Sequence, residues 1–236
     1  MQPILIEEAR WREREGVFAD RAAAGELLAA KLSAWQGLDG LVLAIPAGGV
    51  PVAVPIARNL KLPLELLIVR KVQIPWNTEA GFGALAPDGQ VILNEPLVRA
   101  LDLTPAQIQA QIKATKQNLR EREAVFRGNR PYPEMTGKTL IVVDDGLASG
   151  YTILAALQFL LRQQPQQLIV AVPTGLLDTI NTIMAKTGAT VVCLNVRTRR
   201  PFAVAAAYQR WYDLSEAEVL ALLRERGLGQ KEAADA

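Results

Sequence analysis

The sequence predicts an α/β protein built on a doubly wound, mostly parallel sheet of about five strands. Five short, nearly uninterrupted apolar runs recur along the chain, and segments with helical periodicity separate most of them. Such runs are typical of strands that are covered on both faces, as in parallel sheets. A single run could equally be one turn of a buried helix, so the prediction depends on the set of five. The runs are 41–45, 64–69, 140–143, 168–172 and 191–194.

The helical segments carry their own signals. A capping box at Thr104, with proline in the first helical position, begins a polar helix that should run to about Phe126. A second capping box at Ser215 begins the last helix. Helices over 152–161 and 176–186 should connect the later strands. A helix with one apolar face is expected before the first strand, from Ala24, Leu27, Leu28, Leu32 and Trp35.

The connection between the second and third predicted strands is abnormally long, at about 70 residues. Within it, the turn 87–89 predicts a hairpin between 81–86 and 91–93. An insertion of this type, at about 73–137, is often a lid that closes over a site and excludes water. An oligomer arm or a decorative subdomain is the alternative interpretation, and Glu79 within the insertion is a candidate active-site acid.

Length and composition favour one domain and exclude several kinds of chemistry. Half of the 236 residues are hydrophobic, enough for one core over 1–228, and the small, polar end at 229–236 is expected to be disordered. The formal net charge of only +2 gives no indication of the basic surface that nucleic-acid binding requires. Because the chain has no histidine, a Ser-His-Asp triad and a His-ligated metal are excluded. The one cysteine, Cys193, lies in an apolar run and is expected to be buried.

Neither a membrane span nor a signal peptide is expected. The longest apolar stretch, 41–57, is broken by three prolines and two glycines, whereas a bilayer span needs about 20 mostly apolar residues. The N-terminus lacks the basic start and apolar core of a signal peptide. We therefore expect a cytoplasmic protein whose partners are neither membranes nor nucleic acids.

Two acids, Asp144 and Asp145, follow the apolar run 140–143 and precede the small loop 146–152. Ligands of open α/β sheets bind at the carboxyl ends of the strands. Carboxylates accept hydrogen bonds from sugar hydroxyls, while the loop offers backbone N–H groups and two hydroxyl side chains to a phosphate. Because adjacent strand residues point to opposite faces, the two acids need not have the same task. The pattern favours a ribose 5-phosphate site, with an ordinary strand-to-helix loop as the alternative.

This segment resembles the phosphoribosyl pyrophosphate (PRPP) signature of the type I phosphoribosyltransferases, with four apolar residues, two acids and a small-residue loop. The resemblance extends over about 18–223 and is nearest to a bacterial group of predicted phosphoribosyltransferases. Pro46–Ala53 matches one segment of that group. Val69–Lys71 matches another, a strand end, so Arg70 and Lys71 are expected to end the second parallel strand. The resemblance implies a type I phosphoribosyltransferase-like fold with a small hood at about 195–213. Hood candidates for contact with the acceptor are Arg197, Arg199, Arg200, Phe202 and Trp211.

The resemblance also implies a set of site residues. Asp144, Asp145 and Lys71 would be catalytic. Mg²⁺ would arrive mainly on PRPP, with Asp144 as the candidate protein ligand. PRPP would be bound by Asp144, Asp145, Gly146, Leu147, Ala148, Ser149, Gly150, Tyr151 and Thr152. The leaving pyrophosphate would be bound by Ala47, Gly48, Gly49, Arg70 and Lys71. Without the resemblance, a plain turn would be the default interpretation of two glycines between a strand and a helix, although such a pair can also form an anion cradle.

The activity that the resemblance implies is transfer of a phosphoribosyl group from PRPP to an unidentified nitrogenous base, with release of pyrophosphate, by a Mg²⁺-dependent homodimer. Position 47 departs from the family pattern, because the group has Arg where this chain has Ala47. One lost contact to developing charge costs about 10²–10³ in rate by analogy with oxyanion donors. A non-catalytic PRPP- or nucleotide-binding regulator on the same fold is therefore the alternative, and a metal-dependent phosphohydrolase is a third.

Overall fold

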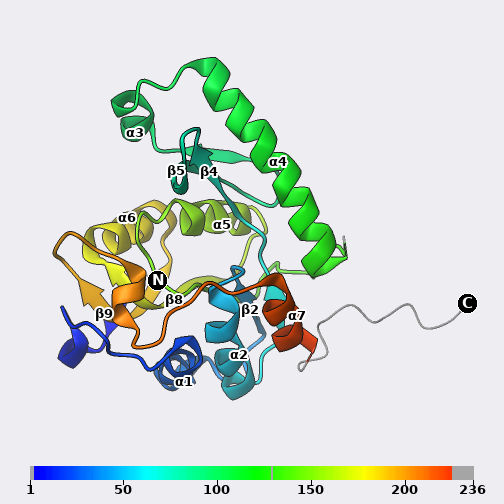
Figure 1. The fold of residues 1–236 in the computed structure, drawn as a ribbon. Helices are drawn as coiled ribbons and strands as arrows, with labels where there is room; N and C mark the ends of the chain where they lie inside the picture. The colour runs from blue at the N-terminus through cyan, green and yellow to red at the C-terminus, as the bar shows by residue number, and fades with distance from the viewer. Residues whose placement is uncertain (1–2, 129, 225–236) are drawn as a thin grey trace, which may run out of the picture.

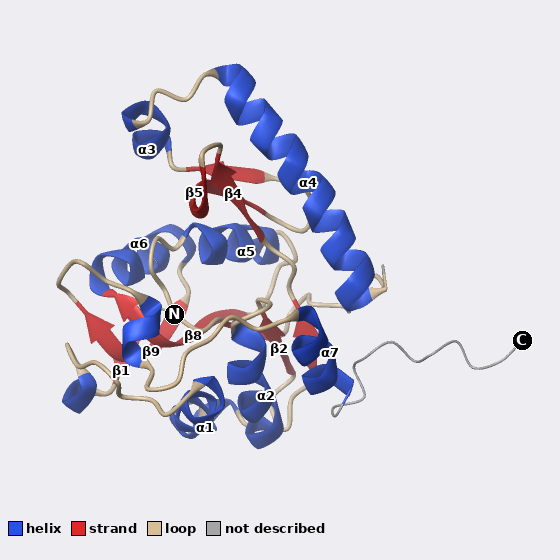
Figure 2. Ribbon diagram, viewed as in Figure 1, coloured by secondary structure: helices blue, strands red, loops and turns tan. Residues whose placement is uncertain are grey.

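A six-stranded parallel sheet forms the centre of the computed structural model, which describes residues 3–128 and 130–224 (Figures 1 and 2). Its strands are β1 (Leu5–Glu7), β2 (Gly40–Ala44), β3 (Leu64–Leu66), β7 (Thr139–Val143), β8 (Gln167–Leu176) and β9 (Thr190–Arg197). They lie in the order β1-β9-β8-β7-β2-β3, and all five pairings are parallel. The predicted fold class is confirmed, with β1 as an edge strand beyond the five apolar runs.

Helices cover both faces of this sheet and make a three-layer domain (Figure 1). Alternate strand residues face the two layers, so that Ile141 and Val143 pack on the side of α1 and α2, and Leu140 and Val142 pack on the side of α5 and α6. The first layer holds α1 (Arg21–Lys31), α2 (Gly49–Leu60) and α7 (Glu216–Arg224), and the second holds α5 (Tyr151–Leu161) and α6 (Leu177–Thr187). Short 3₁₀ turns complete the chain at η1 (Ala9–Trp11), η2 (Ser33–Trp35) and η3 (Val204–Ala207).

The long connection between β3 and β7 forms a lobe with its own antiparallel sheet, which lies over α5 (Figure 1). Its elements are β4 (Arg70–Ile74), β5 (Asn77–Leu85), β6 (Val91–Leu93), α3 (Glu95–Ala100) and α4 (Pro105–Arg127). The predicted hairpin and the capped helix are confirmed, since β5 pairs with β6 and Thr104 and Gln107 complete a capping box. A small apolar core inside the lobe consists of Val72, Ile74, Phe82, Val98 and Leu103.

The run 64–69, predicted as one strand, is divided in the structure. The parallel strand β3 ends at Leu66, and the Leu67 N–H makes a last bond to Ala44 O at 2.9 Å. Ile68 and Val69 stay buried without belonging to either sheet, which explains why the apolar run continues past the end of the strand. Arg70 and Lys71 therefore begin the antiparallel sheet of the lobe, and the expectation that they end a parallel strand is wrong.

Arg127 fastens the end of the lobe to β3. Its side chain is fully buried, its Nη1 donates to Leu66 O at 3.0 Å, and the same nitrogen lies 2.6 Å from the Glu65 carboxylate. The guanidinium carbon lies 3.7 Å from the centre of the Tyr132 ring. The lobe thus starts and finishes at the same edge strand.

No helix among residues 3–128 and 130–224 is both long and apolar enough to span a bilayer. The predicted cap at Ser215 is confirmed, because Glu218 N–H donates to its hydroxyl at 3.3 Å. The boundaries of the insertion and the hood stay predictions. The predicted tail at 229–236 lies outside the described residues.

Candidate active site

The two acids that follow β7 lie on opposite sides of the sheet. Asp144 lines a cavity beneath the lobe, whereas Asp145 meets Arg21 of α1 on the other side. The alternation of β7 continues through both residues, as expected for adjacent positions of extended chain. The pair that looks uniform in the sequence thus has two different surroundings.

The two carboxyl groups also differ electrostatically. Burial raises the pKa of Asp144 well above its usual range, and the charge of Asp145 raises it further. Burial also raises the pKa of Asp145, but the ion pair with Arg21 opposes this effect. Asp145 therefore has its counter-charge within the protein, whereas Asp144 is suited to accept donors or a cation supplied by a ligand.

The loop 146–150 that follows the acids is fastened to β8 and α6. Leu147 makes two backbone hydrogen bonds to β8, with N···O distances of 2.9 and 3.0 Å. The Thr179 hydroxyl donates to Ala148 O at 2.7 Å. Gly150 has a φ of 78°, in the left-handed region that favours glycine. The loop is thereby held in one shape ahead of α5.

The start of α5 is suited to bind a phosphate. The first N–H groups of a helix have no partner within the helix, and the helix dipole favours an anion beside them. The N-cap of this helix is Gly150, which has no side chain that could occupy these N–H groups. Ser149 and Thr152 add hydroxyl groups, and both residues line the cavity next to Asp144.

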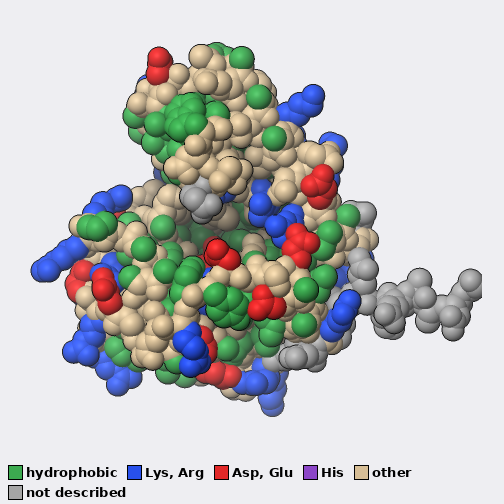
Figure 3. Space-filling model, in the orientation of Figure 1, with side chains coloured by type: hydrophobic (Ala, Val, Ile, Leu, Met, Phe, Trp, Pro, Cys, Tyr) green, Lys and Arg blue, Asp and Glu red, His purple; other side chains and the backbone are tan. Residues whose placement is uncertain are grey.

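This cavity, of about 370 Å³, lies between the loop and the lobe, where the surface is hollowed in Figure 3. Asp144 and 146–153 form one wall, and Lys71, Ala80 and Gly81 are part of the other. The stem of Lys71 passes over Gly81, where a Cβ would lie 2.2 Å from Lys71 Cγ. The structure thus brings an acid, the predicted phosphate loop and a lysine into one cavity.

The loop 46–48 lies between β2 and α2, directly beside the two acids. The strands β2 and β7 are neighbours, and the chain order reverses between them, which makes this the switch point where open α/β sheets bind ligands. A Cβ on Gly48 would lie 2.0 Å from Asp145 Oδ2, and one on Gly49 would lie 2.5 Å from Val143 O. Glycine is needed at both positions for this close approach.

Arg70 and Lys71, predicted together as diphosphate contacts, face different surroundings. Lys71 lines the cavity. Burial and the nearby Arg122 of α4 lower the pKa of Arg70, and Glu216 of α7 opposes them. Arg122 also pairs with Glu216 at 2.8 Å. Arg70 is therefore associated with α4 and α7, and the structure places Lys71 as the cation of the cavity wall.

Arg21 belongs to the site and is missed by the sequence interpretation. Its side chain is 8% exposed, and its Nε donates to Asp145 Oδ2 at 2.9 Å. Its Nη1 donates to Tyr212 O at 2.8 Å, and its guanidinium carbon lies 3.7 Å from the centre of the Trp211 ring. Asp20, the N-cap of α1, could have located the start of this helix. No local signal indicates that the following side chain is buried.

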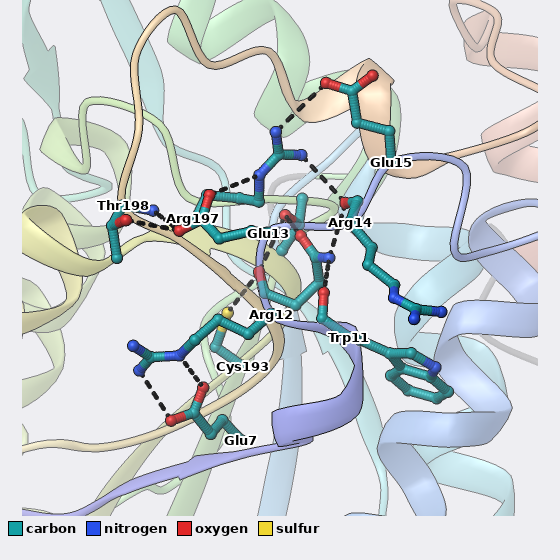
Figure 4. Close-up of polar contacts among 11 residues, drawn as sticks. Glu7, Trp11, Arg12, Glu13, Arg14, Glu15, Cys193, Arg197 and Thr198 are labelled. Atoms are coloured by element: carbon teal, nitrogen blue, oxygen red, sulfur yellow. Dashed lines mark hydrogen bonds and ion pairs between the residues drawn. The ribbon is translucent and has the colours of Figure 1, made fainter.

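The chain beyond β9 packs against the N-terminal segment, and backbone hydrogen bonds join 16–19 to 206–210. Figure 4 shows the polar contacts that hold the end of β9 in the same region. Arg197 Nη2 donates to Glu15 at 3.3 Å, and its Nε lies 3.6 Å from Glu13. Arg197 is thus a buried, paired side chain of the scaffold, not an exposed contact for an acceptor.

A second cavity, of about 540 Å³, shares three lining residues with the first. Two of the hood candidates, Arg200 and Phe202, contribute to it. Trp211 instead stacks on Arg21, and Arg199 is exposed. The lining consists of Asn94, Ala148, Ser149, Tyr151, Leu176, Thr179, Arg200, Pro201 and Phe202.

The donors in the described chain fit a metal ion that arrives with a phosphorylated substrate. Among residues 3–128 and 130–224, no group of three or more His, Cys, Asp or Glu side chains is placed to hold a metal. Asp144 supplies a carboxylate at the cavity wall. Mg²⁺ keeps several waters and commonly binds one or two carboxylates together with substrate phosphates, so this set suits it. The side chain of Glu79, the other predicted acid, lies outside the described residues.

The sequence of this chain matches a family model and curated proteins. A family model described as "Phosphoribosyl transferase domain" matches residues 20–197. Two proteins of Mycobacterium tuberculosis, from strains CDC 1551 / Oshkosh and H37Rv, are each named "Putative phosphoribosyl transferase" and are 37% identical over 207 residues. These matches cover 88% of this chain and 46% of each relative, so the chain spans about half the length of the curated relatives it matches.

One solved structure is similar to this chain in both sequence and fold. The crystal structure of TT1426 from Thermus thermophilus is 33% identical in sequence and superimposes with a TM-score of 0.69. The match covers 88% of this chain and 98% of TT1426. The fold, the matched residues and the sequence identity together show that this chain belongs to the phosphoribosyl transferase domain family.

Proposed function

We propose that this chain transfers the phosphoribosyl group of PRPP to a nitrogenous base and releases pyrophosphate. The observation that best supports the proposal is the single cavity that combines Asp144, Lys71 and the start of α5. These groups offer acceptors for ribose hydroxyls, a cation for a diphosphate and N–H groups for the 5′-phosphate. PRPP carries all three of the matching chemical groups.

The reaction is a displacement at ribose C1. The C1–O bond to the diphosphate breaks, a nitrogen of the base forms the new C1–N bond from the opposite face, and that nitrogen loses its proton. The transition state resembles an oxocarbenium ion, so no covalent nucleophile of the protein is required. The protein orients the two reactants and stabilises the charge of the departing diphosphate.

Each part of the site has a task in this proposal. The loop 146–152 and the first turn of α5 hold the 5′-phosphate. Asp144 and Asp145 hold the ribose hydroxyls, Asp144 from the cavity wall. The loop at Gly48 and the side chain of Lys71 contact the diphosphate. Mg²⁺ bound with PRPP would help to neutralise the charge of the leaving diphosphate, and Asp144 is its candidate protein ligand.

The second cavity is the proposed acceptor site, because it shares Ala148, Ser149 and Tyr151 with the cavity proposed to bind PRPP. Phe202 offers a ring on which a flat base can stack. Asn94 and Arg200 offer polar groups for the edge of the base.

Two measurements test the proposal. Titration calorimetry with PRPP in the presence of Mg²⁺ should show binding to the purified protein. A panel of purine and pyrimidine bases, assayed with PRPP and Mg²⁺, should then identify a base that is consumed as pyrophosphate is released. Absence of PRPP binding would contradict the proposal, and release of orthophosphate in place of pyrophosphate would indicate a phosphohydrolase.

Ala47 favours a second candidate, a non-catalytic PRPP- or nucleotide-binding regulator on the same fold. Position 47 carries no cation, and Arg70 is associated with α4 and α7. A regulator should bind PRPP tightly and release no pyrophosphate with any base. If the wild type is inactive and Ala47→Arg becomes active, the result would support the regulator.

We also propose that the protein is a homodimer in the cytoplasm. Both statements extend the family resemblance to this chain. Light scattering over a range of protein concentrations would detect a dimer, and a mass equal to one chain at all concentrations would exclude it. Cell fractionation would test the location.

A further inference from the structure

Three separate parts of the chain meet through the side chain of Arg21. From the start of α1, its Nε donates to Asp145 Oδ2 at 2.9 Å, and its Nη1 donates to Tyr212 O at 2.8 Å. Its guanidinium carbon lies 3.7 Å from the centre of the Trp211 ring. Because the side chain is 8% exposed, the ion pair is shielded from solvent and from salt.

Asp145 is restrained on two further sides. The Tyr208 hydroxyl donates to Asp145 O at 2.6 Å, and the Gly48 backbone lies against the Asp145 carboxylate. Asp145 N–H in turn donates to Asp144 Oδ1 at 2.9 Å, so the restraint reaches the acid on the cavity wall. The carboxylate of Asp145 is therefore fixed between α1, the chain around 208–212 and the loop before α2.

We propose that Arg21 is a positioning residue for phosphoribosyl transfer. By holding Asp145 against Gly48, Arg21 sets the spacing between the ribose site and the diphosphate site, which two different strands present. Arg21 does not touch the substrate and acts through Asp145. This inference rests on the proposed function, because it assigns a role within the PRPP site.

Arginine suits this position for a geometric reason. Its planar guanidinium offers donors in fixed directions and stacks on aromatic rings, whereas the lysine ammonium is a compact point charge. The contacts of Arg21 with Asp145, Tyr212 and Trp211 use all of these properties. The variant Arg21→Lys should therefore keep the charge and lose the fixed geometry.

Titration calorimetry with PRPP and Mg²⁺ measures the effect. Arg21→Ala should raise the Kd for PRPP by about 10- to 100-fold, by analogy with residues that orient metal ligands. Arg58→Ala is the matched control, because Arg58 of α2 also forms an ion pair with a residue of α1, Glu26, but an exposed one. The control should leave the Kd for PRPP unchanged.

A double-mutant cycle separates positioning from general destabilisation. If Arg21 acts through Asp145, Arg21→Ala should change the Kd of the Asp145→Asn variant by no more than about twofold, the margin within which independent effects are measured. Equal fold-changes in the two backgrounds would overturn the proposal. Should Arg21→Ala fail to fold, Arg21→Lys replaces it in the cycle, and wild-type affinity in Arg21→Lys would also overturn the proposal.

A cavity of about 450 Å³ beside Arg21 permits chemical rescue, since Arg21 itself is one of its lining residues. Millimolar guanidinium chloride, far below the concentrations that unfold proteins, should restore part of the PRPP affinity of Arg21→Ala. Sodium chloride at the same concentration should not. A folded Arg21→Ala that guanidinium fails to restore would count against the positioning role.

Titration of the wild-type protein with PRPP separates a failure of the proposed function from a failure of the positioning role of Arg21. A wild-type protein that does not bind PRPP would overturn the proposed function. A wild-type protein that binds PRPP, together with an Arg21→Ala variant of equal affinity, would overturn the positioning role alone.

Discussion

Gly48 and Asp145 follow different strands of the sheet, yet a methyl group on Gly48 would lie 2.0 Å from Asp145 Oδ2. Real Cβ atoms essentially never approach another heavy atom within 3.0 Å, so one group would have to move. Asp145 is held by Arg21 and cannot move without loss of that ion pair. Gly48→Ala should therefore weaken PRPP binding by about tenfold or more, equivalent to about 1.4 kcal/mol, as measured by calorimetry with Mg²⁺.

Gly37→Ala is the control for this change. Gly37 has a φ of 70°, which disfavours alanine, but a Cβ there would meet nothing within 4 Å. This variant should lower the free energy of unfolding by about 1 kcal/mol and leave the Kd for PRPP unchanged. Wild-type PRPP affinity in Gly48→Ala would contradict the importance of the close contact.

Asp144→Asn should separate ligand binding from stability. Burial and the charge of Asp145 raise the pKa of Asp144, so ionised Asp144 lowers the stability of the fold at neutral pH. An amide removes this cost and also removes the charged acceptor that ribose hydroxyls and Mg²⁺ require. Without ligand at pH 7, the variant should melt above the wild type, and it should bind PRPP at least about tenfold more weakly.

The pH dependence of this effect has a defined sign. The pKa of Asp144 in the folded state lies above its ordinary value of 3.8. The carboxyl group therefore takes no free energy from folding below pH 3.8, and the loss is complete only above the folded-state pKa. The difference in melting temperature between Asp144→Asn and the wild type should therefore vanish in acid and grow as the pH rises above 3.8. A difference that does not change with pH would show that the charge is not its cause.

Lys71→Met should weaken PRPP binding more than Arg70→Met does. Lys71 lines the cavity beside Asp144, whereas Arg70 is associated with Arg122 and Glu216. Loss of one charge-assisted contact costs about 1.5–3 kcal/mol, or about 10- to 100-fold in Kd. Calorimetry on both variants at two salt concentrations tests the difference, and a larger effect of Arg70→Met would reverse the assignment.

Cys193 should be unreactive in the folded protein. Burial raises the pKa of its thiol, and only the thiolate reacts readily with disulfide reagents. Addition of a chromogenic disulfide at pH 8 should release no colour from the native protein and one equivalent from the unfolded protein. Rapid reaction of the native protein would show that β9 opens to solvent.

Elements with strong local signals could be predicted from the sequence, whereas elements that depend on distant contacts could not. The cap at Thr104 and the five apolar runs are local, and the structure confirms the helix and the sheet. The edge strand β1 has only three half-buried residues and is defined by pairing with β9. The break after Leu66 was missed because Ile68 and Val69 are buried outside the sheet, and an apolar pattern reports burial, not pairing.

The same distinction applies to the site. Asp144, Asp145 and the phosphate loop occupy one contiguous segment, so the pattern that predicts a sugar phosphate is visible in the sequence. Strand alternation predicts that the side chains of the two acids point to different faces of the sheet, but it does not tell which of them faces the lobe. Arg21 lies 124 positions before Asp145, and an arginine at a helix start is ordinarily solvated. Its role required the tertiary structure.

The contact of Arg127 with Leu66 has a consequence for how such a chain can diversify. The lobe leaves the domain just after β3, at Arg70, and Arg127 ties its far end to the same strand. With both ends already held together, the entropy of closing this loop depends only weakly on the length between them. The lobe is therefore an exchangeable module. It can be shortened, enlarged or replaced while the acids and the phosphate loop at the edge of the sheet stay in place.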